Sequence, residues 1–207
     1  MKNIVLLLLI LLGFFTAKAQ NATPPRGSSY QDSVRSNNAT EGKTIMANGD
    51  PMNTSKDFVE NLTTSKSYTL FLASLRAASL VGTFKSRGPL TVFVPSDTAF
   101  TRKLGKKLDT LMMPVHKYEL INILSYHVVP GQYTAKDLNK LIKAGKGEAS
   151  LLTLSGSKLV VKIDSNRNII LLDETGGQSI VSQFDIMQSN GVMHLATQAL
   201  IPKDRAL

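Results

Sequence analysis

The sequence contains no cysteine and no tryptophan, and only three of its 207 residues are histidine. Without cysteine the chain has no disulfide framework, no thiolate zinc site, no iron–sulfur cluster and no cysteine nucleophile. Aromatic residues make up 6%, charged residues 19% and hydrophobic residues 43%. This balance is typical of a globular protein rather than of a disordered one. Beyond residue 15 no apolar run is long enough to span a membrane.

The common enzyme motifs are missing as well. We find no G-x-S-x-G elbow, no H-E-x-x-H, no Walker A pattern and no G-x-G-x-x-G. A Ser-His-Asp triad needs no fixed spacing, so it stays open with His116, His127 and His194 as its only possible bases. We expect a protein that is not an enzyme and that needs no cofactor.

Metal binding depends on the same three histidines. His127 and His194 are 67 residues apart and could meet in the fold, which leaves a partial zinc site open as an alternative. No two histidines have the i, i+2 or i, i+4 spacing of paired ligands. We expect instead no metal site, with each ring hydrogen-bonded to backbone and packed among apolar side chains.

The N-terminus has the form of a secretory signal peptide. Lys2 precedes an apolar run over residues 4–15, and Ala17 and Ala19 form an A-x-A end. We expect cleavage between Ala19 and Gln20, with residues 1–19 as the signal peptide and no membrane span afterwards. An uncleaved anchor is the alternative, although the run is short for a span of about 20 residues. The protein is therefore expected to be exported to the periplasm, the cell surface or the extracellular space.

Two regions are expected to follow. Residues 20–47 are rich in Asn, Thr, Ser, Gly and Pro, which predicts a flexible segment. Residues 48–204 are expected to form one folded domain. Four asparagines stand in N-x-S/T patterns and would be glycan acceptors in a eukaryotic secretory pathway: Asn21, Asn38, Asn53 and Asn61.

The chain carries a formal net charge of +9. Removal of residues 1–19 takes away two lysines and no acid, so the mature charge would be +7. This balance favours acidic partners. Lys103, Lys106 and Lys107 form the tightest basic group and are a candidate anion contact. No nucleic-acid-reading motif accompanies them, so a nucleic acid is not an expected partner.

Hydrophobic periodicity predicts helices in the first half and strands in the second, which indicates an α+β fold. The expected helices cover residues 58–62, 68–81, 97–100, 114–124 and 135–144. Ser55 is expected to cap the first helix, Ser96 or Asp97 the third, and Thr134 the last. Gly82 is expected to end the second helix, and Tyr118 to lie on the apolar stripe of the fourth. The expected strands cover residues 90–94, 151–154, 159–163, 169–172, 180–187 and 192–201, the last two joined by an Asn-Gly turn.

Three segments, in order, resemble the signatures of the fasciclin-like domain family. Residues 88–100 read GPLTVFVPSDTAF, similar to TVFAPT-x-x-AF, and residues 123–131 read ILSYHVVPG, similar to the central Tyr-His segment. Residues 185–202 read DIMQSNGVMHLATQALIP, similar to NGVIHVID-x-VLLP. The resemblance is greatest to single-domain secreted bacterial members. Val94 and Thr197 depart from the pattern, Thr197 standing where an aspartate is usual.

The resemblance implies a β-wedge or sandwich with helices packed along one side, and an adhesion role without catalysis. The partner would be an envelope or matrix protein or a glycan. In animal members the Tyr-His and Asp-Ile segments are implicated in integrin contact. The matching positions here are Tyr126, His127, Asp185 and Ile186, and a purely structural role for them is the alternative. A small-ligand carrier with a pocket between sheet and helices is the alternative function.

Overall fold

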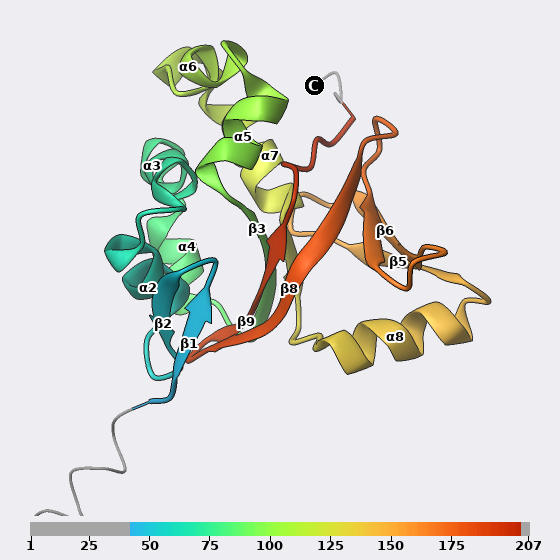
Figure 1. Cartoon of the computed structure of the whole chain (residues 1–207). Coiled ribbons are helices and arrows are strands. Elements are labelled where there is room, and N and C mark those ends of the chain that lie inside the picture. Colours follow the sequence, from blue (N-terminus) through green and yellow to red (C-terminus); the bar gives the residue numbers. More distant parts are fainter. Residues whose placement is uncertain (1–41, 204–207) are drawn as a thin grey trace, which may run out of the picture. The chain divides into compact units, whose positions relative to one another are not determined.

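The computed structural model describes residues 42–203. A β-hairpin, a group of helices and a large sheet follow one another along the chain (Figure 1). The helices are α2 (Phe58–Thr64), α3 (Thr69–Ala77), α4 (Val81–Ser86), α5 (Asp97–Leu104), α6 (Lys107–Leu111), α7 (Lys117–Tyr126) and α8 (Ala135–Ala144), with a 3-10 turn at Pro114–His116. The strands are β1 (Thr44–Ala47), β2 (Asp50–Asn53), β3 (Leu90–Pro95), β4 (Val128–Pro130), β5 (Glu148–Leu152), β6 (Lys158–Ile163), β7 (Ile169–Leu172), β8 (Gln178–Gln188) and β9 (Gly191–Ala196).

Seven strands form one sheet in the order β4-β3-β9-β8-β7-β6-β5. All neighbours are antiparallel except β3 and β9, which run parallel with Leu90 opposite Gly191 and Pro95 opposite Ala196. The carboxyl ends of these two strands therefore lie together. The α+β class and the packing of helices against a sheet, predicted from the sequence, are confirmed.

Two apolar clusters lie on opposite faces of β3 and β9. Side chains alternate along a strand, so Val92 and Val94 join the cluster under α2–α7, whereas Phe93 joins the cluster under α8 and β5–β7. Helix α8 packs against β5 and β6, and its buried residues Leu138 and Ile142 belong to the second cluster. Burial of these apolar surfaces is the main stabilising contribution to the fold.

The folded part begins a few residues earlier than predicted. Residues 44–47 were expected to be flexible, but they form β1 and pair with β2 through an Asn48-Gly49 turn. The side chain of Gln183 on β8 fixes this hairpin: its Nε2 donates to the Met46 carbonyl at 2.6 Å, and its Oε1 accepts from the Asn48 amide at 3.3 Å. Polar composition alone did not reveal this hairpin, because the Gln183 side chain that holds it lies 135 residues from Asn48 in the sequence.

The single helix predicted over residues 68–81 is in fact two helices. The chain leaves α3 at Ser79, which has φ of 59°. Ser79 and Leu80 donate their amides to the carbonyls of Arg76 and Leu75, the pattern of a helix C-cap that usually has glycine at this position. A serine there gave no signal for a helix end. Gly82, which was expected to end the helix, lies inside α4.

Two further local predictions were wrong. The cap of α2 is Asp57 rather than Ser55, and Asp57 forms a capping box with Glu60. Tyr118 was placed on the apolar stripe of the helix after Pro114, but it is 79% exposed. The 3-10 turn at Pro114–His116 changes the helical phase before α7 begins, so a stripe counted from Pro114 does not match the buried face.

Candidate functional site

Tyr126 and His127 end α7 and lead into β4, and neither side chain is exposed. The Tyr126 hydroxyl donates to the Lys158 carbonyl at 2.9 Å and accepts from the Glu174 amide at 3.2 Å. Burial raises the pKa of the Tyr126 phenol. The hydroxyl therefore stays protonated and joins α7 to the ends of β6 and β7.

His127 has both ring nitrogens occupied. Nδ1 lies 2.8 Å from the Ile123 carbonyl and donates to it, while Nε2 accepts from the Leu200 amide at 3.0 Å. This arrangement fixes the neutral tautomer with the proton on Nδ1. Burial lowers the pKa of His127 to about 4. The ring also makes an edge contact with Phe71, at 5.8 Å between centroids.

Asp185 and Ile186 lie where β8 is interrupted by an irregularity in its pairing with β9. Asp185 has φ of 57°, and its Oδ1 accepts from the Ala135 amide at 2.8 Å, at the first turn of α8. Ile186 is fully buried in the cluster under the helices. Asp185 therefore holds the N-terminus of α8 to the sheet.

His194 completes this arrangement and is equally buried. Its Nδ1 accepts from the Asp185 amide at 3.2 Å, and its Nε2 donates to the Tyr133 carbonyl at 2.8 Å. Phe93 stacks on the ring at 5.5 Å, and Phe184 meets it edge-on at 5.9 Å. Burial lowers the pKa of His194. The ring is thus neutral and orders the turn before α8.

The four candidate contact residues are not joined by hydrogen bonds. No hydrogen bond among residues 42–203 joins Tyr126 or His127 to Asp185 or Ile186. Tyr126, His127 and Ile186 are each 0% exposed and line none of the five hollows identified within residues 42–203, so a partner could reach them only by opening the core.

The two buried histidines, His127 and His194, are not arranged to bind a metal ion. In both His127 and His194 the ring nitrogen without a proton already accepts a hydrogen bond from a backbone amide, so its lone pair is not free to coordinate an ion. Within residues 42–203 no group of three or more His, Asp or Glu side chains could hold a metal ion.

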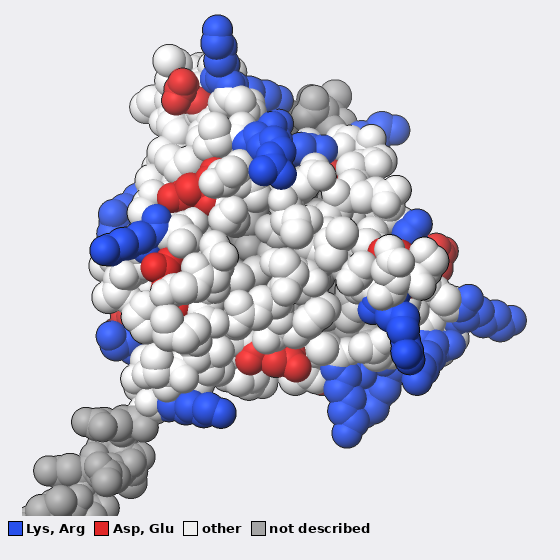
Figure 2. All heavy atoms as spheres, in the orientation of Figure 1, with Lys and Arg blue, Asp and Glu red and all other residues white. Residues whose placement is uncertain are grey.

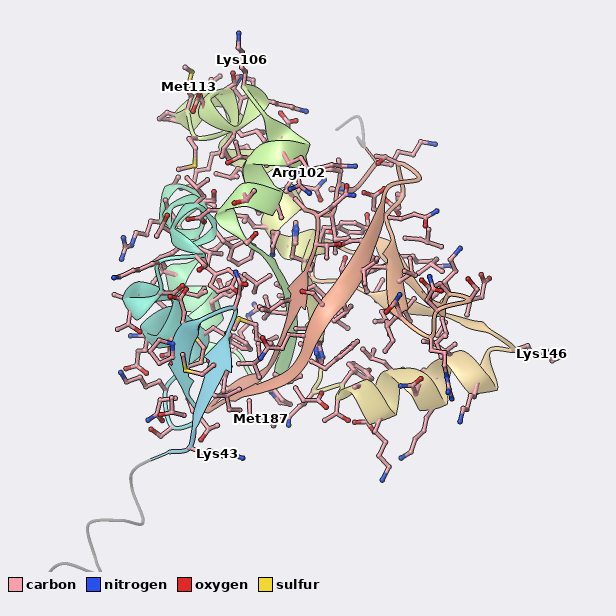
Figure 3. The ribbon with its side chains drawn as sticks, viewed as in Figure 1. Lys43, Arg102, Lys106, Met113, Lys146 and Met187 are labelled. Carbon is pink, nitrogen blue, oxygen red and sulfur yellow. The ribbon has the colours of Figure 1, made fainter. Side chains whose placement is uncertain are left out.

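The three lysines of the basic group point to different partners. Lys103 lies 3.8 Å from Asp173, whose side chain is 1% exposed, and Lys107 lies 2.6 Å from Glu119. Lys106 stands exposed at the start of α6, at the far end of this part of the molecule (Figure 3). Lys103 and Lys107 also line one hollow of about 170 Å³ together with Glu119, so an anion contact at this group stays a prediction.

An open face of the sheet offers more to a partner. Along the first half of β8 the residues Gln178, Ile180 and Ser182 point away from the buried Ser179 and Val181. No helix of the part of the chain that the structure describes covers this stretch, which lies between the β1–β2 hairpin with α5 on one side and the curled β6–β7 strands on the other (Figure 1). In the same view the surface over β8 and β9 is mostly uncharged, with Lys and Arg toward its margins (Figure 2).

Two hollows run along this face, and we call them together the β8 groove. The first, of about 250 Å³, lies at the start of α5 and is lined by Asn48, Tyr68, Ser96, Thr98, Ala99, Arg102, Ser182, Leu195, Ala196 and Thr197. The second, of about 430 Å³, is lined by Lys162, Ile163, Asp164, Ile170, Gln178, Ile180, Thr197 and Gln198. Thr197 borders both hollows, so they lie next to each other.

Sequence reasoning did not identify the groove. Alternation in β8 would have marked Ile180 and Ser182 as outward-facing, and Thr197 stood out as a departure from the closing signature. Tyr68 and Arg102 gave no signal, because Tyr68 fits an apolar helical stripe and Arg102 stands beside the lysine group.

Comparison with known proteins identifies the fold seen here. A model of the fasciclin domain matches residues 66–202. The chain belongs to the fasciclin domain family. The match spans β3, the Tyr-His segment and β9, the three segments that carried the resemblance in the sequence.

Similar proteins of this family occur in bacteria and animals. The chain is 31% identical to Protein sll1483 of Synechocystis sp. over 144 residues, which cover 70% of this chain and 72% of that protein. It is also 31% identical to human periostin over 150 residues, covering 72% of this chain but 16% of periostin.

A solved fasciclin domain pair from the insect cell adhesion molecule Fasciclin I has the same fold. It aligns with a TM-score of 0.62 at 18% identity, covering 70% of this chain and 51% of that one.

Proposed function

We propose that this fasciclin domain is a non-catalytic interaction module of an exported protein, and that its β8 groove binds an envelope or matrix macromolecule. The observation that carries the proposal is the uncovered first half of β8, with Ile180 39% exposed in the second hollow. Relatedness to a domain found in an insect cell adhesion molecule supports the same role. The expected signal peptide supports export, and no helix within residues 42–203 is both long and apolar enough to cross a membrane.

Charge supports a partner that is acidic. Residues 42–203 contain more Lys and Arg than Asp and Glu, and most of the Lys and Arg in this view stand toward the margins of the face (Figure 2). Arg102 and Lys162 also line the first and second hollows of the groove. Positive charge speeds encounter with an acidic partner and is screened by salt, whereas the uncharged lining residues supply contact area.

Catalysis and small-ligand carriage have less support. His127 and His194 are buried with both ring nitrogens bonded, so neither can act as a base on a substrate. The five hollows identified within residues 42–203 have mixed linings with many polar or charged side chains, whereas a small-ligand carrier would have a mainly apolar pocket with a few convergent polar groups.

The test is capture of partners from the producing cell's envelope, proteins and glycans separately, on the immobilised protein at low and high salt. Ile180→Asp places a charge in the second hollow of the groove and is expected to reduce saturable capture at least tenfold. Val115→Asp is the matched control, because Val115 is an exposed aliphatic residue beyond the groove, 79% exposed. Capture that is equal for both variants, or absent for the unmodified protein, would refute the proposal.

A further inference from the structure

The first hollow of the β8 groove lies where the two parallel strands end. Pro95 and Ala196 are paired at the carboxyl ends of β3 and β9, and α5 begins two residues after Pro95. A crevice beyond the carboxyl ends of parallel strands, facing a helix N-terminus, is a recurrent place for ligands in α/β proteins. A hollow of about 250 Å³ accommodates one small unit, since drug-sized ligands need roughly 300–1,000 Å³.

The hollow is rich in hydrogen-bond donors. The Ser96 hydroxyl oxygen accepts from the Ala99 amide at 3.2 Å, and the Thr197 hydroxyl oxygen accepts from the Ile180 amide at 2.9 Å. With their oxygens used in this way, both hydroxyls have a proton to donate. Arg102 adds a guanidinium on α5 above the end of β9 (Figure 3), and no carboxylate among residues 42–203 lies within ion-pair distance of it.

Tyr68 supplies an independent observation. Its side chain is 0% exposed and lines the hollow, yet its hydroxyl has no hydrogen-bond partner within residues 42–203. A buried hydroxyl without a partner is costly, so such groups are rare unless a ligand or water completes them. Burial, with Asp50 and Asp97 nearby, raises the pKa of Tyr68, so the hydroxyl stays a donor. It lacks an acceptor.

The two nearby carboxylates are occupied elsewhere. Asp97 accepts from the Thr69 and Leu70 amides at 3.1 and 2.8 Å, at the start of α3. Asp50 accepts from the Lys66 and Ser67 amides at 3.1 and 2.9 Å. Neither lines the hollow. The negative charges of Asp50 and Asp97 still disfavour a highly charged anion in the hollow. The single cation Arg102 is therefore matched by a ligand group with one negative charge.

We propose that this hollow binds a uronic acid unit of an acidic glycan, with the carboxylate held by Arg102 and the hydroxyls of Tyr68 and Ser96. This inference rests on the proposed function and names its partner class. A carboxylate carries a single charge and matches the planar guanidinium, whereas a phosphate monoester would add a second charge beside Asp50 and Asp97. Groups that both donate and accept, at Asn48, Ser182 and Thr98, suit the hydroxyls of a sugar ring, and the second hollow leaves room for the next unit.

The experiment is titration of the purified protein with sodium glucuronate, glucose and sodium phosphate at one fixed ionic strength, by calorimetry or by NMR. Glucuronate is expected to bind saturably, with glucose and phosphate at least tenfold weaker. Arg102→Gln and Tyr68→Phe are each expected to weaken glucuronate binding about tenfold or more, the range for a hydrogen bond to a charged group. Arg76→Gln is the control, since Arg76 is exposed on α3, does not line the hollow and loses the same charge.

The variants also separate binding from folding. Because the Tyr68 hydroxyl has no partner, Tyr68→Phe is expected to keep the thermal midpoint of the free protein unchanged or to raise it. Phosphate that binds as tightly as glucuronate, or glucuronate binding that Arg102→Gln does not weaken, would overturn the inference. If glucuronate does not bind but the capture of envelope partners still depends on Ile180, this inference alone is refuted. If the unmodified protein captures no envelope partner at all, the proposed function is refuted.

Discussion

Gly191→Ala is expected to destabilise the domain by about 4 kcal/mol, or to prevent folding, because it combines backbone strain with overpacking. Gly191 has φ of 150°, and a Cβ there would lie 2.0 Å from the Leu90 carbonyl oxygen. That oxygen belongs to the backbone of β3 and cannot move without disturbing the parallel pair. Since a small domain has only about 5–15 kcal/mol of stability, the loss would be severe.

Gly147→Ala is the matched control for Gly191→Ala. Gly147 has φ of 117°, but no atom lies within 4 Å of the added Cβ, so only the backbone strain remains. We expect a cost of about 1–2 kcal/mol there. Urea denaturation of both variants distinguishes the two contributions, and equal stabilities would contradict the close approach of β9 to β3.

Acid is expected to destabilise the domain from about pH 6.5 downwards, which is above the pH at which most carboxylates titrate. The pKa of His127 is lowered to about 4 in the folded protein, against about 6.5 in an unfolded chain. Between these values the unfolded state binds the proton and the folded state does not, so stability falls as pH falls. The loss for His127 is roughly 3 kcal/mol between pH 6.5 and 4.

His194 acts in the same direction, because burial lowers its pKa too. Protonation of its Nδ1 would break the bond from the Asp185 amide and loosen the turn before α8. Asp50, Asp137 and Asp164 also have lowered pKa values, so their stabilising contributions are lost as pH falls below about 5, where the unfolded chain begins to take up protons. The window from pH 6.5 to about 5 therefore reports mainly on the two buried histidines.

The measurement is the free energy of unfolding in urea at pH 7.5, 6.0, 5.0 and 4.5. His127→Gln is expected to be less stable at pH 7.5 and to show a clearly shallower pH dependence. His116→Gln, which removes a partly exposed imidazole outside both apolar clusters, is the control and should keep the steep dependence. If the His127 variant does not fold, the pH profiles of the unmodified protein and of His116→Gln still show whether the free energy of unfolding falls between pH 7.5 and 5. A flat free energy from pH 7.5 to 5 would contradict the account.

Local chemistry made much of the fold predictable. The buried strand over 90–94, the Ser96 cap of α5 and the Thr134 cap of α8 all follow from short-range patterns, and the structure has them. The Asn190-Gly191 turn was also predicted. Its further role was not, because Asn190 also bonds to Phe58 and Phe84, more than 100 residues away in sequence.

The candidate site was less predictable for a related reason. Tyr126 and His127 stand out as an unusual polar pair, but their burial depends on partners such as Lys158 and Leu200, which only the fold brings near. Arg102 and Thr197 are 95 residues apart and meet only because β3 and β9 run parallel. No periodicity in a single segment encodes that neighbourhood.

The most direct test of the central claim is oxidative footprinting of the protein with and without a partner obtained by capture. Met46, on β1 two residues before the groove residue Asn48, and Met113, just after α6, are matched probes, being 54% and 53% exposed (Figure 3 labels Met113). The account predicts that a bound partner protects Met46 and Ile180 and leaves Met113 and Tyr118 as reactive as before. Protection of Met113 or Tyr118 with Met46 unchanged would place the interface on the helices and contradict the β8 groove as the binding face.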